Sequence, residues 1–162
     1  MNHSASPMSL HELLSPLAMD LRLKETRREE VLRALVVKLP ETAANPAAQE
    51  VLLKALLDRE ALHSTGIGDG VALPHARHAL VGIVERPVIV FGRHEKGIPF
   101  GAVDRRDAKL FFLLVAPNVT SHLQMLSKLS RVLRHSRVRE ALLVAESPDR
   151  IIQIIREAES GP

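Results

Sequence analysis

The sequence contains no cysteine, no tryptophan and no tyrosine. Without cysteine, the chain cannot form a disulfide framework, a thiolate zinc site, an iron–sulfur cluster or a cysteine nucleophile. Phenylalanine supplies the four remaining large aromatic side chains, at Phe91, Phe100, Phe111 and Phe112. Proteins bind single-stranded nucleic acid by stacking its bases on exposed aromatic rings. With so few aromatic residues, the composition argues against single-stranded nucleic-acid binding.

Neither sign of charge dominates, and long apolar runs are absent. The chain has 22 basic and 19 acidic residues, a formal charge of +3 and no block of like charge, so no nucleic-acid partner is expected. The longest apolar run, residues 110–117, is far shorter than the roughly 20 residues of a membrane span. The N-terminus lacks the basic start and apolar segment of a secretory signal. We therefore expect a cytoplasmic protein with no membrane span.

The 162 residues are typical of one globular domain. Residues 1–8 are predicted to be a flexible N-terminal leader and residues 9–159 a single domain. Apolar residues recur with helical period in the first third of the chain and again after residue 121, whereas 88–91 and 110–115 have the composition of buried strands. Helices first, strands in the middle and helices last predict an α/β fold, with a central sheet flanked by helices.

Capping residues predict where the helices begin. Thr26 and Ser121, each followed three residues later by Glu or Gln, match the capping box. Asn45–Pro46 and Ser147–Pro148 combine an N-cap residue with proline at the first helical position. The segment from His94 to Asp107 contains glycine, proline and several charges, and is predicted to be a loop or hairpin.

Three glycines at alternate positions, Gly66, Gly68 and Gly70, precede a short apolar run that ends in Pro74–His75. The segment is not a Walker loop, because no Gly-Lys-Ser/Thr follows, and it is not a dinucleotide fingerprint, because it follows a helix and precedes a strand. Two interpretations remain: a tight turn in which glycines adopt positive φ, or a backbone surface that another molecule approaches closely.

His75 is a candidate nucleophile. It directly follows a proline at the end of a predicted strand, where one ring nitrogen can bind a backbone carbonyl while the other faces solvent. With an ordinary pKa of about 6.5, much of such an imidazole is unprotonated near neutral pH. The alternative is a surface histidine with no function.

His122 is the second candidate. It lies on the same helical face as the apolar stripe Leu126, Leu129 and Leu133, and in the first turn of the predicted helix. Free backbone N–H groups there attract anions, so Ser121 and His122 could lie beside a phosphate. The alternative is a buried core histidine that is hydrogen-bonded to a neighbour.

Arg77 and Arg59 are candidate auxiliary cations. Arg77 would share a side with His75 on an extended strand, and Arg59 closes the helix before the glycine segment. Each could instead be an ordinary solvated or helix-capping arginine. A zinc or nickel site built from His75, His78 and either His94 or His122 is the less favoured reading, since no His-Glu-x-x-His helix is present. We expect no metal and no cofactor.

Residues 57–77, Leu-Asp-Arg-Glu-Ala-Leu-His-Ser-Thr-Gly-Ile-Gly-Asp-Gly-Val-Ala-Leu-Pro-His-Ala-Arg, resemble the hallmark of the enzyme IIA domain of the fructose/mannitol class of the phosphotransferase system (PTS). Residues 110–115 and 120–130 resemble the second signature of that family. The similarity extends from about Leu10 to Glu157. A free-standing chain of this length looks like the nitrogen-regulatory enzyme IIA, although stand-alone sugar-specific IIA proteins exist.

The resemblance implies the PTS EIIA type-2 fold, with a mixed sheet between helices. It implies that His75 accepts a phosphoryl group on Nε2 from the phosphocarrier HPr or its nitrogen-branch paralogue. His122 matches the second site histidine, Arg59 an arginine near the site, and Arg77 a position that is often basic. The segment 93–107 is more charged than the family pattern, which bears on the choice of partner.

The expected function is therefore that of a cytoplasmic phosphotransferase component, a phosphocarrier. The acceptor would be a IIB domain in sugar transport, or regulatory targets such as a kinase, a transporter or a transcription regulator. The alternative from another class is a purely regulatory protein-binding module that acts without phosphoryl turnover.

Overall fold

The structure is a computed structural model that describes residues 8–78, 80 and 82–161. Most of the predicted leader, residues 1–7, lies outside the described residues. Its last residue, Met8, is described, and its carbonyl accepts a hydrogen bond of 2.6 Å from Nζ of Lys128. Within the described part of the chain, no helix has both the length and the hydrophobicity of a membrane span.

The centre of the molecule is one mixed sheet of five strands in the order β1-β4-β5-β3-β2. β1 runs parallel to β4 and β3 parallel to β5, whereas the pairs β4–β5 and β2–β3 are antiparallel. The predicted mixed sheet is confirmed. The strands are β1 (Met19–Asp20), β2 (Gly66–Gly68), β3 (Val71–Ala72), β4 (Val88–Ile98) and β5 (Ala108–Val115).

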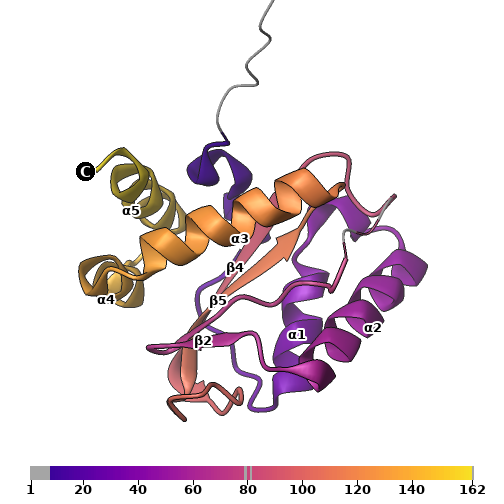
Figure 1. The fold of residues 1–162 in the computed structure, drawn as a ribbon, viewed down its shortest axis with the longest axis horizontal. Coiled ribbons are helices and arrows are strands. Elements are labelled where there is room, and N and C mark those ends of the chain that lie inside the picture. Colours follow the sequence, from indigo (N-terminus) through magenta and orange to yellow (C-terminus); the bar gives the residue numbers. More distant parts are fainter. Residues whose placement is uncertain (1–7, 79, 81, 162) are drawn as a thin grey trace, which may run out of the picture.

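Helices cover both faces of the sheet (Figure 1). Helices α1 and α2 pack on one face, and α3, α4 and α5 pack on the other together with the N-terminal turn η1. The helices are α1 (Arg28–Val37), α2 (Pro46–Leu62), α3 (Val119–Leu133), α4 (Ser136–Val144) and α5 (Pro148–Ser160), with 3₁₀ turns η1 (Leu10–Leu13), η2 (Pro16–Ala18) and η3 (Pro40–Thr42).

The two central strands are buried on both faces, which is why their sequences are almost continuously apolar. Successive side chains of a strand point to opposite faces, so Phe112 packs against α3–α5 while Phe111 packs against α1 and α2. Each ring has an aromatic neighbour: Phe91 lies 5.1 Å from Phe112, and Phe100 lies 5.6 Å from Phe111, between ring centroids. Two apolar layers therefore hold one rigid sheet between them.

Two of the four predicted helix starts are confirmed. Asn45 and Ser147 cap α2 and α5 through their side chains, each followed by proline. The other two predictions were wrong. α1 begins two residues after Thr26, at Arg28, and α3 begins at Val119 because Asn118, rather than Ser121, is its N-cap. Asn118 is a strong capping residue that comes earlier in the chain, so it starts the helix before Ser121 is reached.

The segment from His94 to Asp107 was predicted to be a loop or hairpin, and it is a hairpin, because antiparallel β4 and β5 are joined by residues 99–107. β4 continues to Ile98, because its charged outer half remains paired with β5 as far as Ala108. The glycine segment does form the predicted tight turn. Gly68 and Gly70 have φ of 92° and 79°, so each adopts the left-handed conformation that glycine favours.

The parallel pairing of β3 with β5 determines what lies at one edge of the sheet. β3 runs on through Pro74 to His75, which forms an isolated parallel bridge with Leu114 near the end of β5. The amide of Leu114 donates to the carbonyl of Pro74 at 2.9 Å. The carboxyl ends of parallel strands meet at one edge, so His75 emerges beside the segment that leads into α3.

Candidate functional site

The structure brings His75 and His122 together. Their ring centroids are 5.4 Å apart and the ring planes are inclined by 59°. His75 comes from the end of β3, and His122 comes from the first turn of α3, directly after β5. The side chain of His75 is partly exposed, whereas His122 is only 8% exposed.

One nitrogen of His75 is occupied by the backbone. Nδ1 lies 2.7 Å from the carbonyl oxygen of Leu73. A carbonyl can only accept a hydrogen bond, so Nδ1 carries the proton and Nε2 carries the free lone pair. The tie to a backbone carbonyl that the sequence predicts is therefore present, and it selects the tautomer in which Nε2 can act as a nucleophile.

Burial lowers the pKa of His75, because desolvation disfavours the imidazolium. The hydrogen bond to Leu73 acts in the opposite direction, and the positive charges of Arg59 and His122 reinforce the lowering. The pKa of His122 is lowered as well, first by burial and then by the charge of His78. Both shifts favour the neutral imidazole.

Asn118 organises the start of α3 beside the two rings. Its Oδ1 accepts hydrogen bonds from the amide and from the hydroxyl of Ser121, both at 2.9 Å, and its carbonyl accepts from the amide of His122 at 3.1 Å. The amides of Val119 and Thr120 remain for an anion at this helix N-terminus. Sequence reasoning missed Asn118, although asparagine three residues before Ser121 was a usable signal.

The predicted phosphate contact of Ser121 remains a prediction. Its side chain is buried and its hydroxyl proton points to Asn118. To donate to a bound anion, the hydroxyl would have to rotate away from that acceptor.

The two candidate cations line one cavity, which also includes Ala76, the residue after His75. Arg59 donates from Nη1 to the carbonyl of His63, which caps the end of α2, and its charge reaches His75. Arg77 is exposed two residues beyond His75. Both arginines line the cavity of about 400 Å³, together with Leu62 and Ala76.

The metal-binding alternative finds no support in the geometry. Among residues 8–78, 80 and 82–161, no three His, Asp or Glu side chains are grouped as a metal site requires. His94 lies in the outer half of β4, well away from His75, which is bridged to the other end of β5. The candidate site therefore comprises two imidazoles and a helix N-terminus, with Arg59 and Arg77 as candidate cations.

Comparison with known sequences decides the family. Residues 12–158 match the family described as "Phosphoenolpyruvate-dependent sugar phosphotransferase system, EIIA 2". The chain belongs to the PTS EIIA type-2 family. Members of this family are phosphotransfer components, and the phosphocarrier role that the sequence predicts follows from membership.

The sugar-specific relatives differ in length: one is much longer than this chain, and another is of similar length. The EIIA domain is 36% identical over 152 residues to the PTS system fructose-specific EIIABC component of Bacillus subtilis, covering 93% of this chain but only 23% of that relative. It is 41% identical over 111 residues to the PTS system fructose-specific EIIA component of Haloferax volcanii, covering 67% of this chain and 70% of the relative. The chain thus spans about a quarter of the first relative and most of the second.

Solved structures include both branches of the family. The nitrogen regulatory protein IIA-Ntr of Neisseria meningitidis superimposes with a TM-score of 0.78 at 30% identity, covering 90% of this EIIA domain and 97% of that chain. A chain of the complex of enzyme IIAMtl with phosphorylated enzyme IIBMtl from Escherichia coli superimposes with a TM-score of 0.75 at 26% identity. The match covers 89% of this domain and 97% of that chain. Both comparisons confirm the fold.

The lowered pKa values predict how the stability of the EIIA domain depends on pH. Unfolding returns both histidines to a pKa near 6.5, so the unfolded chain binds more protons than the folded chain below that value. The free energy of unfolding should therefore fall as the pH drops from 7 to 5. Urea denaturation at several pH values measures it.

The control for this prediction is a variant with both histidines changed to glutamine, His75→Gln/His122→Gln. Its free energy of unfolding should change less between pH 7 and 5 than that of the unmodified domain. Equal pH dependence in the two proteins would show that other groups cause it.

Proposed function

We propose that His75 is the phosphoryl acceptor of this EIIA domain. The observation that carries the proposal is the hydrogen bond from Nδ1 to Leu73, which leaves the Nε2 lone pair free for in-line attack on phosphorus. As the bond between Nε2 and phosphorus forms, the bond between phosphorus and the donor's histidine nitrogen breaks. Nδ1 of His75 keeps its proton throughout, and the electron pair of the broken bond returns to the donor imidazole.

The surroundings of His75 supply stabilisation for the transferred group. A phosphoryl group on Nε2 brings negative charge next to His122, near the first amides of α3 and within reach of the charge of Arg59. We assign His122 as the group that donates a hydrogen bond to the phosphoryl oxygens. Arg59 and Arg77 act as auxiliary cations, and Ser121 holds the helix start in place through Asn118.

We infer that the donor is a phosphohistidine protein, HPr or its nitrogen-branch paralogue, met in the cytoplasm. The side chains of Leu62, Ile67, Val119 and Leu123 are 54%, 48%, 63% and 59% exposed, and they come from the elements that surround the site. Val119 and Leu123 are four residues apart on one face of α3, next to His122. An apolar rim of this kind suits a transient partner whose own histidine must reach Nε2.

Reconstitution tests the proposal. The domain is incubated with enzyme I, HPr and labelled phosphoenolpyruvate, and the label is located by protease digestion under alkaline conditions, where phosphohistidine survives. We expect stoichiometric label in the peptide that contains His75, dependent on both HPr and enzyme I. Label in any other peptide, or none, would overturn the assignment.

The docking role of the rim predicts a change in KM. Leu123→Asp should raise the KM for phospho-HPr about tenfold with little change in kcat, because it removes an apolar contact without touching the histidines. Val144→Asp is the matched control, since Val144 is 76% exposed on α4, and it should leave both constants unchanged. If both variants raise the KM for phospho-HPr equally, these apolar side chains do not form the docking surface.

The acceptor distinguishes two branches of this function. A phosphorylated IIB domain is seen with one structural relative, which favours onward transfer to a IIB domain as in sugar transport. The similarity to IIA-Ntr favours the second candidate, regulation of a kinase, a transporter or a transcription regulator. Transfer of label from the phosphorylated domain to a purified IIB domain supports the first, and a target bound only by the unphosphorylated form supports the second.

A further inference from the structure

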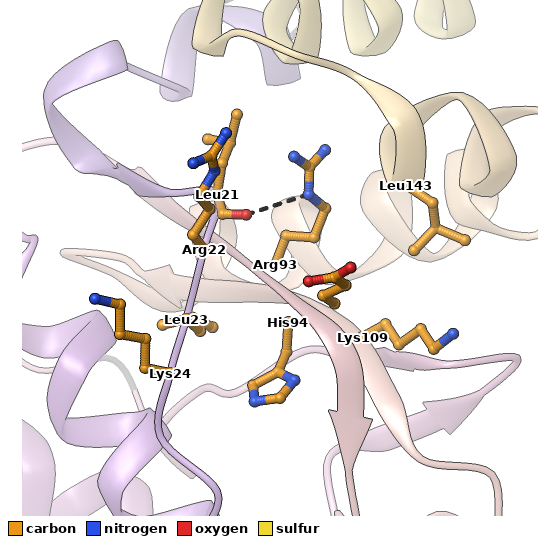
Figure 2. Close-up of a pocket in the computed structure, with 9 residues that line it drawn as sticks. Leu21, Arg22, Leu23, Lys24, Arg93, His94, Lys109 and Leu143 are labelled. Carbon is orange, nitrogen blue, oxygen red and sulfur yellow. Dashed lines mark hydrogen bonds between the residues drawn. The ribbon is translucent and has the colours of Figure 1, made fainter.

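Another cavity, with a polar lining, lies at the other end of the sheet. It has a volume of about 650 Å³ and is lined by the segment Leu21–Lys24, by β4 residues 93–95, and by Lys109 and Leu143 (Figure 2). Sites for small ligands typically have volumes of about 300–1,000 Å³, so this one is large enough. It is formed by four segments that are distant in sequence, namely the chain after β1, β4, β5 and α4.

The cavity is strongly basic. Arg22, Lys24, Arg93 and Lys109 line it, against one carboxylate, Glu95. Among the described residues, none of these five side chains forms an ion pair within 4.0 Å. Lys24 and Lys109 lie on opposite sides of the cavity, while Arg22 and Arg93 extend to the same side (Figure 2). Four cations therefore line one cavity with little internal neutralisation.

Arg93 is held rigidly at the centre of this cluster. Its Nη1 donates to the carbonyls of Leu142 and Ala145 at 2.9 and 2.6 Å, and its Nε donates to that of Leu21 at 3.3 Å. These bonds use Nε and Nη1, so the N–H groups of Nη2 remain for a ligand. Burial, and then the charge of Arg22, lower the pKa of Arg93.

His94, in the wall of the same cavity, has an unsatisfied donor. The ring is 7% exposed, and Nδ1 accepts a hydrogen bond of 3.0 Å from the amide of Gly97. The proton of the neutral ring must then be on Nε2, and this buried atom has no hydrogen-bond partner. His94 follows Arg93 directly on β4, and the two side chains point to opposite sides of the strand (Figure 2), so this buried donor does not face the guanidinium and is not part of the proposed site.

The cavity is separate from the phosphoryl site. His75 is bridged to Leu114, which pairs with Ile89 on β4, whereas Arg93 is four residues further along the same strand. At about 3.3 Å per residue, the two sites are roughly 13 Å apart along β4. A ligand in the basic cavity therefore leaves Nε2 of His75 free for the donor protein.

We propose that this cavity binds a small anion that carries at least two phosphate or carboxylate groups. Lys24 and Lys109 lie on opposite sides of the cavity (Figure 2), so an anion with two separated negative groups suits it better than one with a single group. Oxygen acceptors of that kind can accept hydrogen bonds from Nη2 of Arg93 and from the lysine ammonium groups. Because Arg93 connects the chain after β1 to the end of α4, the ligand would also stabilise the contact between these elements.

Calorimetric titration of the whole chain at low ionic strength tests the proposal, with pyrophosphate and citrate as probes. We expect saturable binding of one equivalent of at least one probe, and the preferred probe distinguishes phosphate from carboxylate chemistry. Lys24→Gln/Lys109→Gln should weaken binding about tenfold or more. Glu95→Gln should tighten it, since it removes the one opposing charge, a gain that a merely structural effect would not produce.

The matched control is Lys38→Gln/Lys54→Gln, which removes two exposed lysines from the α1–α2 side and should leave affinity unchanged. Labelling of His75 by HPr should be normal in every lysine variant, so this test does not depend on the phosphoryl site. No saturable binding of either probe, equal weakening in the control, or loss of binding in His122→Ala instead of the lysine variant would each overturn the proposal.

Discussion

His75→Ala should abolish phosphoryl acceptance, with the rate of labelling by phospho-HPr at least about 10³-fold lower than for the unmodified domain. The reason is that Nε2 is the nucleophile, and His122, although close, is 8% exposed and cannot be reached in line by a donor protein. Rapid-quench labelling measures the rate. The variant should remain folded, because the ring of His75 is partly exposed and forms one hydrogen bond.

The matched control is His135→Ala. His135 is exposed at the start of α4, and its side chain caps nothing there, so labelling should proceed at the normal rate. Retention of more than a small fraction of the label in His75→Ala would mean that another group is the acceptor. Circular dichroism of the variant ensures that lost labelling is not lost folding.

The identity of the reacting nitrogen gives a sharper version of the same test. Since Nδ1 donates to Leu73, the phosphoryl group should appear on Nε2, and Nδ1 should keep its proton in the phosphorylated protein. Nitrogen chemical shifts of ¹⁵N-histidine-labelled domain distinguish the two ring positions. Phosphorylation at Nδ1 would require the hydrogen bond to Leu73 to break and would contradict the proposed geometry.

The layered fold could be predicted from the sequence because its signals are local. The runs at 88–91 and 110–115 lack the alternation of a half-solvated strand, which indicates burial on both faces. Asn45–Pro46 and Ser147–Pro148 fix helix starts through a side-chain cap and a restricted φ within a few residues. For these strands and helix starts, the local signal and the structure agree.

The errors and the open alternatives arise where pairing or competition outweighs local preference. The outer half of β4 contains charges and Gly97 and resembles a loop, but its backbone is paired with β5, and its ends are held by tertiary contacts such as those of Arg93. At the start of α3, Asn118 and Ser121 are both good caps, and sequence alone does not rank two caps three residues apart.

The site could be predicted only in part, for a geometric reason. His75 and His122 are each recognisable from their local context, but they are 47 residues apart and no sequence period relates them. The parallel pairing of β3 with β5 brings them together, and only the family resemblance anticipated this. The basic cavity around Arg93 has no such motif, since its side chains come from four segments, so nothing in the sequence indicated it.

His122→Ala should slow phosphoryl transfer about 10²-fold without abolishing it, since the nucleophile remains while one donor to the phosphoryl oxygens is lost. His122→Gln, which keeps an N–H donor, should recover part of the rate. Rapid-quench labelling of both variants measures this. A full rate in His122→Ala would show that the second ring only packs against the first.

The pKa of His122 provides a readout that packing alone would not change. In the unphosphorylated domain, burial and the charge of His78 keep the pKa of His122 below its usual value. A dianionic phosphoryl group on the ring 5.4 Å away favours the imidazolium, so phosphorylation should raise that pKa. Titration of the His122 ring protons by NMR in both states should show the increase, and an unchanged or lower pKa would place the phosphoryl group away from this ring.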